Sequence, residues 1–206
     1  RKEEGRMSGT GRAATLPVSF FARPAEVVAP ELLGAVMISR IDGRLTAGRI
    51  VETEAYLGEH DPASHGFGLR RNRRNAALFG PPGTWYVYRS YGMHWCANLV
   101  CHAEGLAAAV LIRALEPLEG LDVMRVRRGG VGDRALCSGP GRLCQALGIT
   151  AALDGVPLAR ALVVVVPGPA LDGARVSATP RVGVSRAADW PLRFVVTGSP
   201  WASRRA

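Results

Sequence analysis

The chain has 206 residues, of which 48% are hydrophobic and 21% charged, a composition that excludes wholesale disorder and suits one substantial domain. Its longest apolar run, residues 106–112, is far shorter than the ~20 residues that cross a bilayer, so we expect neither a membrane span nor a secretory signal. The net charge of +9 rests almost entirely on arginine, because Lys2 is the only lysine, and this excludes catalysis by an internal Schiff-base lysine.

The expected elements follow a polar, glycine-bearing segment. We expect residues 1–17 to form a loose arm or an expression remnant, and residues 18–206 to form a single domain. A helix is predicted over residues 24–33, closed by Gly34. Strand-like runs follow at residues 36–40, 45–57, 85–89, 94–101, 106–115, 161–166 and 193–196. Further helical patterns cover residues 119–128 and 137–147. Because strands come in consecutive runs, we predict an α+β fold, with a mixed, mostly antiparallel curved sheet and peripheral helices.

The strand expected over residues 45–57 carries two carboxylates and a phenol on one face. Side chains alternate along a strand, which predicts three apolar side chains toward the core: Val51, Ala55 and Leu57. The opposite face would carry Glu52, Glu54 and Tyr56. An ordinary solvated surface has this pattern, and so does a row of groups for acid–base chemistry.

The segment at residues 58–83 is rich in Gly, Asn, Arg and Pro, and segments of this length without periodicity are more often functional than accidental. It holds a basic run made of Arg70, Arg71, Arg73 and Arg74. All four tyrosines of the chain fall between positions 56 and 91. Clustered aromatics often fill a core, but beside arginines they also resemble surfaces where bases stack next to phosphate contacts. The arginine surplus favours a nucleic-acid partner, and a GC-rich genome would enrich arginine as well.

Arg113 lies in the otherwise apolar run at residues 106–115. A buried guanidinium needs a carboxylate partner or a ligand, since an unpaired buried charge costs several kcal/mol. We expect either a structural ion pair with Glu52 or Glu116, or a contact that holds Glu54 or its water.

The cysteines do not have the spacing of a metal or disulfide framework: Cys96, Cys101, Cys137 and Cys144. The first two would face opposite sides of a strand, and the last two match no zinc-knuckle spacing. We expect four reduced, mostly buried thiols in a cytosolic protein. A zinc site that adds His94 and His102 to the first two cysteines is the alternative.

Several motifs follow one another in order between residues 32 and 201. They are VETEAYLG at 51–58, SH at 64–65, RN at 74–75, PGTWYVY at 82–88, YGM at 91–93, LIRALEP at 111–117, SGP at 138–140 and PRVGV at 180–184. Together they resemble the alkyladenine (3-methyladenine) DNA glycosylase family. The resemblance implies a compact α+β domain that acts on damaged double-stranded DNA without a metal or redox cofactor. With it we expect a monomer in the bacterial cytoplasm, associated with the nucleoid through DNA.

The resemblance also implies catalytic roles. Glu54 matches the general base that activates water against the anomeric carbon. Arg113 matches the arginine that helps to hold this water, and the backbone near Val182 would share that task. The basic run at residues 70–74 would contact the DNA backbone. These roles suit cleavage of an N-glycosidic bond, because a carboxylate beside the sugar stabilises an oxocarbenium-like state and orients water.

Further positions match residues that bind a flipped base. Tyr56 and His65 would stack on one face of the base and Tyr88 on the other. Asn98 would lie at the purine edge, where the family disfavours the amino group of guanine. Tyr91 would enter the duplex where the base has left. Extrusion costs a few kcal/mol, which a wedge and aromatic stacking can offset.

We therefore predict a monofunctional purine-DNA glycosylase of base excision repair. One alternative is a non-catalytic protein that binds damaged DNA. The other is a carbohydrate glycosidase that uses Glu52 and Glu54, although parallel carboxylates on one strand face do not flank a bond. The loop at residues 66–73 has more apolar bulk and more arginine than the family pattern, so the preference among alkylated purines, hypoxanthine and etheno adducts stays open.

Overall fold

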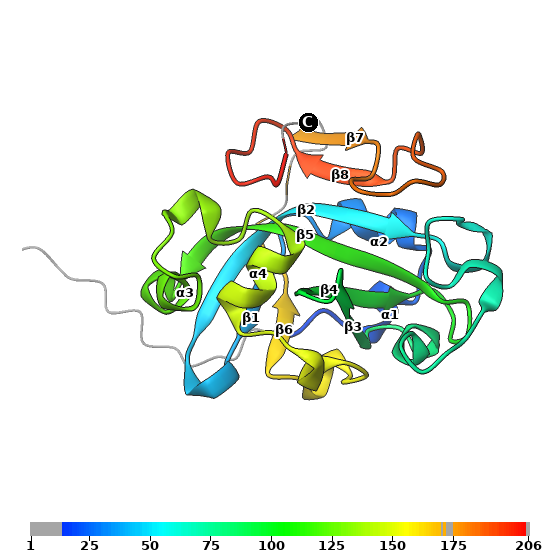
Figure 1. Cartoon of the computed structure of the whole chain (residues 1–206), viewed down its shortest axis with the longest axis horizontal. Coiled ribbons are helices and arrows are strands. Elements are labelled where there is room, and N and C mark those ends of the chain that lie inside the picture. The colour runs from blue at the N-terminus through cyan, green and yellow to red at the C-terminus, as the bar shows by residue number, and fades with distance from the viewer. Residues whose placement is uncertain (1–13, 170, 172–174, 205–206) are drawn as a thin grey trace, which may run out of the picture.

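An antiparallel sheet forms the centre of the molecule (Figure 1). The computed structural model describes residues 14–169, 171 and 175–204, so most of the arm expected at residues 1–17 lies outside the described residues. The described strands are β1 (Val36–Ser39), β2 (Thr46–Tyr56), β3 (Trp85–Ser90), β4 (His94–Cys101), β5 (Ala108–Glu119), β6 (Val163–Val166), β7 (Val176–Thr179) and β8 (Arg193–Val196). Their order is β3-β4-β5-β2-β1-β6, and β8 joins both β2 and β7. The predicted compact α+β domain is confirmed, and the strand pairs described are all antiparallel.

Strand β2 links the two parts of this sheet. On one edge it pairs with β5 from Ala47 to Tyr56. On the other edge it pairs first with β1, over residues 46–49, and then with β8, over residues 52–54. Register shifts around Val51 change the alternation, so that Ile50 and Ala55 both belong to the main core although they are an odd number of residues apart. The second half of β2 therefore lies beside the β7–β8 pair, which forms the top of the molecule in Figure 1.

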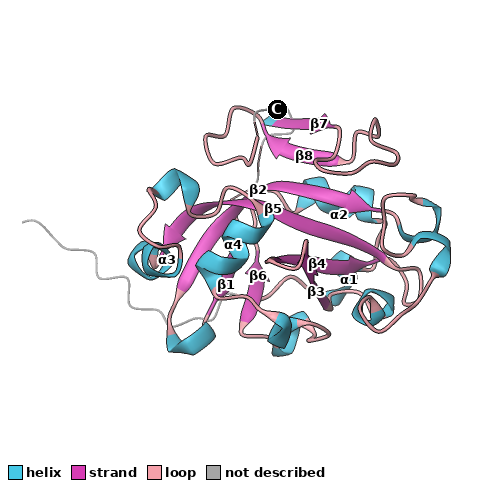
Figure 2. Cartoon of the chain, in the orientation of Figure 1, coloured by secondary structure: helices cyan, strands magenta, loops and turns pink. Residues whose placement is uncertain are grey.

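Short helices and helical turns surround the sheet (Figure 2). The α-helices are α1 (Val18–Phe21), α2 (Ala25–Glu31), α3 (Leu121–Arg127) and α4 (Pro140–Leu147). Helix α2 packs against β2, where Thr53 Oγ1 donates to the Ala29 carbonyl over 2.8 Å. Helix α4 packs against β4 and β5, and both helices contribute buried side chains to the main core. No helix in the described part of the chain has the length and apolar character that a membrane crossing needs.

Most elements expected from the sequence pattern are present. Strands β4 and β8 match their predicted ranges residue for residue, while the four-residue elements α1 and β7 were not predicted. Helix α4 begins at Pro140, later than the predicted residue 137. Proline lacks the N–H that the helix interior needs but fits the first turn, which sets this start.

The long segment at residues 58–83 is held in place by specific contacts. It contains three short 3₁₀ turns at Gly58–His60, Phe67–Leu69 and Ala76–Phe79. Asn75 Nδ2 donates to the carbonyls of His65 and Arg70, each over 2.9 Å. Gly58 has a φ of 74°, and a Cβ at this position would collide with the carbonyl of Leu106. The segment is thereby fixed against the start of β5, and it carries His65 to a defined place.

Candidate active site

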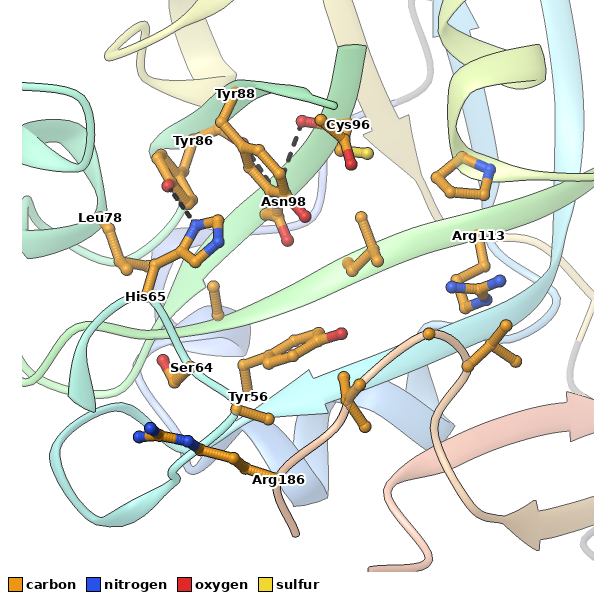
Figure 3. A pocket seen from close by; sticks show the side chains of 18 of the residues that line it. Tyr56, Ser64, His65, Leu78, Tyr86, Tyr88, Cys96, Asn98, Arg113 and Arg186 are labelled. Atoms are coloured by element: carbon orange, nitrogen blue, oxygen red, sulfur yellow. Dashed lines mark hydrogen bonds between the residues drawn. The ribbon is translucent and has the colours of Figure 1, made fainter. Parts of the chain in front are cut away.

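A cavity of about 600 Å³ opens at the ends of β2 and β3, next to β5 and the segment that follows β7 (Figure 3). This volume lies within the range of small-molecule sites. Among the side chains labelled around it are Tyr56, His65, Tyr88, Asn98, Arg113 and Arg186. The first five are site residues predicted from the resemblance. The fold therefore brings these five residues to one cavity, although Tyr56 and Arg113 lie 57 positions apart in the sequence.

Glu54 lies directly behind the cavity wall, fully buried, and three groups hold its carboxylate. Oε1 accepts from the Val182 N–H over 2.7 Å and lies 3.3 Å from Arg113 Nη1. Oε2 accepts from the Tyr56 hydroxyl over 2.8 Å. All three neighbours line the cavity. A carboxylate has about four lone-pair positions, so one remains for a further donor such as water. The Val182 N–H, which we expected to help hold this water, is engaged by the carboxylate itself.

Glu52 has a different environment, although it is fully buried on the same face of β2. Its Oε1 accepts from Arg113 Nε at 2.9 Å, Arg193 Nε at 2.8 Å and Ser203 Oγ at 2.7 Å, and its Oε2 accepts from the Ser203 N–H at 2.6 Å. Burial opposes the charged form, but hydrogen bonds from Arg193 and Ser203 and the charge of Arg113 outweigh it and hold the pKa of Glu52 below its usual value. Three of these bonds go to Oε1, and two of the three donor residues, Arg193 and Ser203, do not line the cavity, so Glu52 is held from the side away from the cavity. This contrast makes Glu54 the candidate base.

Arg113 makes both of the expected kinds of contact at once. It pairs with Glu52 through Nε and with Glu54 through Nη1, and it is 7% exposed, at the edge of the cavity. Burial would lower the pKa of Arg113, but the two carboxylates raise it above its usual value. Glu116, the other expected partner, lies 3.4 Å from Arg49. Because Glu52 and Glu54 share one guanidinium, they do not stand on opposite sides of an open space, as acid and base on a sugar would.

A buried ion pair fixes the backbone that carries Val182. Arg181 Nη2 donates to Asp61 Oδ1 over 2.8 Å, and its Nη1 donates to the Ala55 carbonyl over 3.1 Å. Its guanidinium carbon lies 4.7 Å from the centre of the Tyr56 ring, within cation–π range. The sequence reasoning assigned no role to Arg181 or Asp61. The only sign of a role for Arg181 was its position beside Val182 in the matched PRVGV motif.

Three aromatic rings form one wall of the cavity. Tyr86 and Tyr88 stack with their centroids 5.5 Å apart, and the His65 ring meets Tyr88 edge-on at 4.5 Å. His65 Nδ1 lies 2.8 Å from the hydroxyl of Tyr86, which belongs to the tyrosine cluster seen in the sequence but was not among the predicted site residues. A base between two rings needs roughly 7 Å, twice the usual contact distance, so none fits between His65 and Tyr88 as they stand. In Figure 3, Tyr56 lies across the cavity from this pair, so the open space lies between Tyr56 and the aromatic wall.

His65 is exposed as a whole residue, but partial burial of its ring against Tyr86 and Tyr88 lowers the pKa of His65, so the ring is expected to be neutral at pH 7. The folded state therefore favours the neutral ring. The free energy of unfolding gains from this shift above the unfolded pKa of ~6.5, and the gain is lost as the pH falls below that value. We expect NMR titration to place the midpoint of His65 below ~6.5, and His65→Gln to reduce the acid sensitivity of the melting temperature between pH 7 and pH 5. A midpoint at or above ~6.5 would contradict this expectation.

Asn98 is buried in the cavity wall on β4, opposite Tyr86 of β3. Its Nδ2 donates to the Tyr86 carbonyl over 3.1 Å. The bond fixes the side-chain amide against the hairpin backbone, so that Asn98 presents a rigid polar group to the cavity.

Tyr91 stands at the tip of the β3–β4 hairpin, 88% exposed. It has a φ of 49° and Gly92 a φ of 68°, and the Met93 N–H bonds to the Ser90 carbonyl over 3.0 Å, as in a type I′ turn. The expected turn-borne position is confirmed, and the ring does not pack on the surface of its own domain. Met93, 68% exposed, stands beside it and was not singled out in the sequence.

The basic run beyond the cavity is exposed along its whole length: Arg70, Arg71, Arg73 and Arg74. The Arg71 guanidinium lies 5.7 Å from the centre of the Phe79 ring. Exposed guanidinium groups on a fixed segment suit contacts with phosphate, because they need no partner within the protein.

The four cysteines are buried, free thiols, as expected. Cys96 lines the cavity, whereas Cys101 belongs to the main core, so these two thiols face opposite sides of β4. They cannot converge on one ion. Within the described ranges no group of three or more His, Cys, Asp or Glu side chains is placed to hold a metal.

The site thus combines a buried carboxylate behind an aromatic-walled cavity with an exposed tyrosine and exposed arginines beside it. Residues 19–200 match the family model described as "Methylpurine-DNA glycosylase (MPG)", and the chain belongs to this family. It is similar to proteins named "Putative 3-methyladenine DNA glycosylase". One, from Rhodopseudomonas palustris (strain BisB18), is 50% identical over 190 residues, which cover 90% of this chain and 89% of the relative. Another, from Methanoculleus marisnigri, is 49% identical over 194 residues, which cover 93% of this chain and all of the relative.

Proposed function

We propose that the chain is a monofunctional DNA glycosylase that hydrolyses the N-glycosidic bond of alkylated or deaminated purines in double-stranded DNA. The observation that carries this proposal is the setting of Glu54. Its carboxylate is buried, is held by three groups that line the cavity, and keeps one acceptor position for water. Membership of the methylpurine-DNA glycosylase family supports DNA as the substrate.

Hydrolysis would begin with a water held by Glu54 against the anomeric carbon of the flipped nucleotide. As the base leaves, the sugar gains oxocarbenium character, and a nearby carboxylate stabilises that charge in a site from which bulk water is excluded. Glu54 takes the proton from the water as the new C–O bond forms. Arg113 and the Val182 N–H keep the carboxylate in place, and the departing base takes its electrons into the ring.

The cavity would receive the base between Tyr56 and the wall formed by Tyr88 and His65. Electron-poor or cationic alkylated purines suit these rings, because the faces of aromatic rings are negative. Asn98 would meet the purine edge. The expected partner is damaged duplex DNA, bound by a monomer through the exposed arginines at residues 70–74.

Base release separates this proposal from a protein that only binds damaged DNA. We expect the purified chain to liberate free bases from duplexes that carry single alkylated purines, hypoxanthine or etheno adducts. The panel would also rank these lesions. Tight lesion binding with no release of any base would favour the non-catalytic alternative.

The single lysine predicts the fate of the product. A β-lyase needs an amine that forms a Schiff base with the sugar, and Lys2 is the only lysine of the chain. We expect an intact abasic strand and no covalent protein–DNA adduct after borohydride treatment. A strong adduct that persists in the Lys2→Ala variant would contradict hydrolysis by water.

A further inference from the structure

The last described residues of the chain reach the back of the active site. Ser203 donates from Oγ to Glu52 Oε1 over 2.7 Å and from its N–H to Glu52 Oε2 over 2.6 Å. Ser203 Oγ also accepts from Arg113 Nη2 over 3.3 Å. One hydroxyl therefore contacts both Glu52 and Arg113, which are themselves paired at 2.9 Å.

Arg193 on β8 secures the same region from the other side. Its Nε donates to Glu52 over 2.8 Å, its Nη1 to Thr179 Oγ1 over 3.0 Å, and its Nη2 to the Arg204 carbonyl over 2.8 Å. Arg193 thus links strand β7, strand β8 and the C-terminal segment at residues 201–204 to one buried carboxylate. Neither Ser203 nor Arg193 lines the cavity, and Arg113 is the residue through which these contacts reach it.

We propose that Ser203, acting through Glu52 and Arg113, is a positioning residue for hydrolysis, so that the C-terminal segment completes the catalytic centre. The inference rests on the proposed function. Arg113 has three nitrogens, and two of them are directed away from the reaction: Nε toward Glu52 and Nη2 toward Ser203. Only Nη1 is left for Glu54, at 3.3 Å. The hydroxyl fixes the rotation of the guanidinium and thereby the place of the Glu54 carboxylate.

The rate depends steeply on the position of a catalytic group, since a misplacement of about 1 Å, caused by a mutation far from the reacting atoms, can cost 10²-fold in rate. Loss of one hydrogen bond to charged groups allows a smaller displacement. We therefore expect Ser203→Ala to lower the single-turnover rate of base release by about 10-fold, with the Kd for lesion DNA unchanged within about twofold. The Ser203 N–H bond to Glu52 remains in this variant, so the melting temperature should change little.

Three further variants make the test specific. Ser203→Thr keeps the hydroxyl and should recover most of the rate, which a purely structural contribution to folding would not require. Ser177→Ala is the matched control. It removes an exposed serine hydroxyl of the β7–β8 region, which forms a hydrogen bond with Thr197 Oγ1 over 2.8 Å, and it should leave the rate unchanged. Glu52→Gln removes the charge that both arginines share and should lower the rate more than Ser203→Ala.

The outcomes are distinguishable. If wild-type protein releases no base, the proposed function fails and Ser203 is not the reason. If wild-type protein is active and Ser203→Ala retains its full rate, the positioning role is wrong. A rate loss matched by an equal weakening of lesion binding, or by a large drop in melting temperature, would also overturn it, because the contact would then serve folding or binding only.

Discussion

Replacing Glu54 by glutamine is expected to lower single-turnover base release by about 10²- to 10⁴-fold, the usual contribution of a general base. The amide oxygen can still accept from the Val182 N–H or the Tyr56 hydroxyl, so the cavity wall should stay in place. What is lost is the negative charge that takes a proton from water and faces the developing charge on the sugar. Lesion binding should therefore remain within a few-fold of wild type.

The measurement is excision under single-turnover conditions, together with the Kd for the same duplex. Glu116→Gln is a matched control, because Glu116 is a partly exposed carboxylate of β5 that pairs with Arg49 on the surface. It should retain the wild-type rate. A near-wild-type rate in Glu54→Gln would remove Glu54 from the reaction, and Glu52, which is bound by Arg193 and Ser203 outside the cavity lining, would not easily replace it.

Local pattern was sufficient to predict the parts of the site that lie on regular strands. Alternation along β2 placed Glu52, Glu54 and Tyr56 on one face, and their contacts with Arg113 and each other agree with this. A charge inside the apolar run of β5 indicated that Arg113 must find a carboxylate. Both predictions follow from the period of a strand and from the cost of an unpaired buried charge.

Contacts between distant segments could not be predicted in this way. Arg193 and Ser203 bind Glu52 across 141 and 151 positions, and Arg181 binds Asp61 across 120. Each residue looks like a surface residue when only its sequence neighbours are considered. The register shifts around Val51 are also invisible in the pattern, because they depend on how β5 pairs with β2. The arrangement of His65 against Tyr88 required the fold of the whole 58–83 segment.

Tyr91→Ala is expected to separate a base-flipping enzyme from a protein that merely binds DNA. The ring is 88% exposed on a two-residue turn, so its removal should barely change the melting temperature. If the ring fills the space left by the base, its loss should destabilise the flipped state by about 1–3 kcal/mol, the scale of one base–aromatic stack. The turn itself should survive, because Gly92 remains.

The loss should depend on how firmly the lesion is held in the duplex. A well-paired, well-stacked lesion is the hardest to extrude and should lose the most excision, whereas the same lesion in a mismatch or a single strand should lose the least. Single-turnover excision of one lesion in paired and mispaired duplexes measures this difference. Met93→Ala, which also removes an exposed apolar side chain from the hairpin tip, is the matched comparison and should show a smaller dependence on pairing. Equal losses for Tyr91→Ala in both duplexes would mean that the ring contributes to general DNA contact, because a wedge acts only where a base must be replaced.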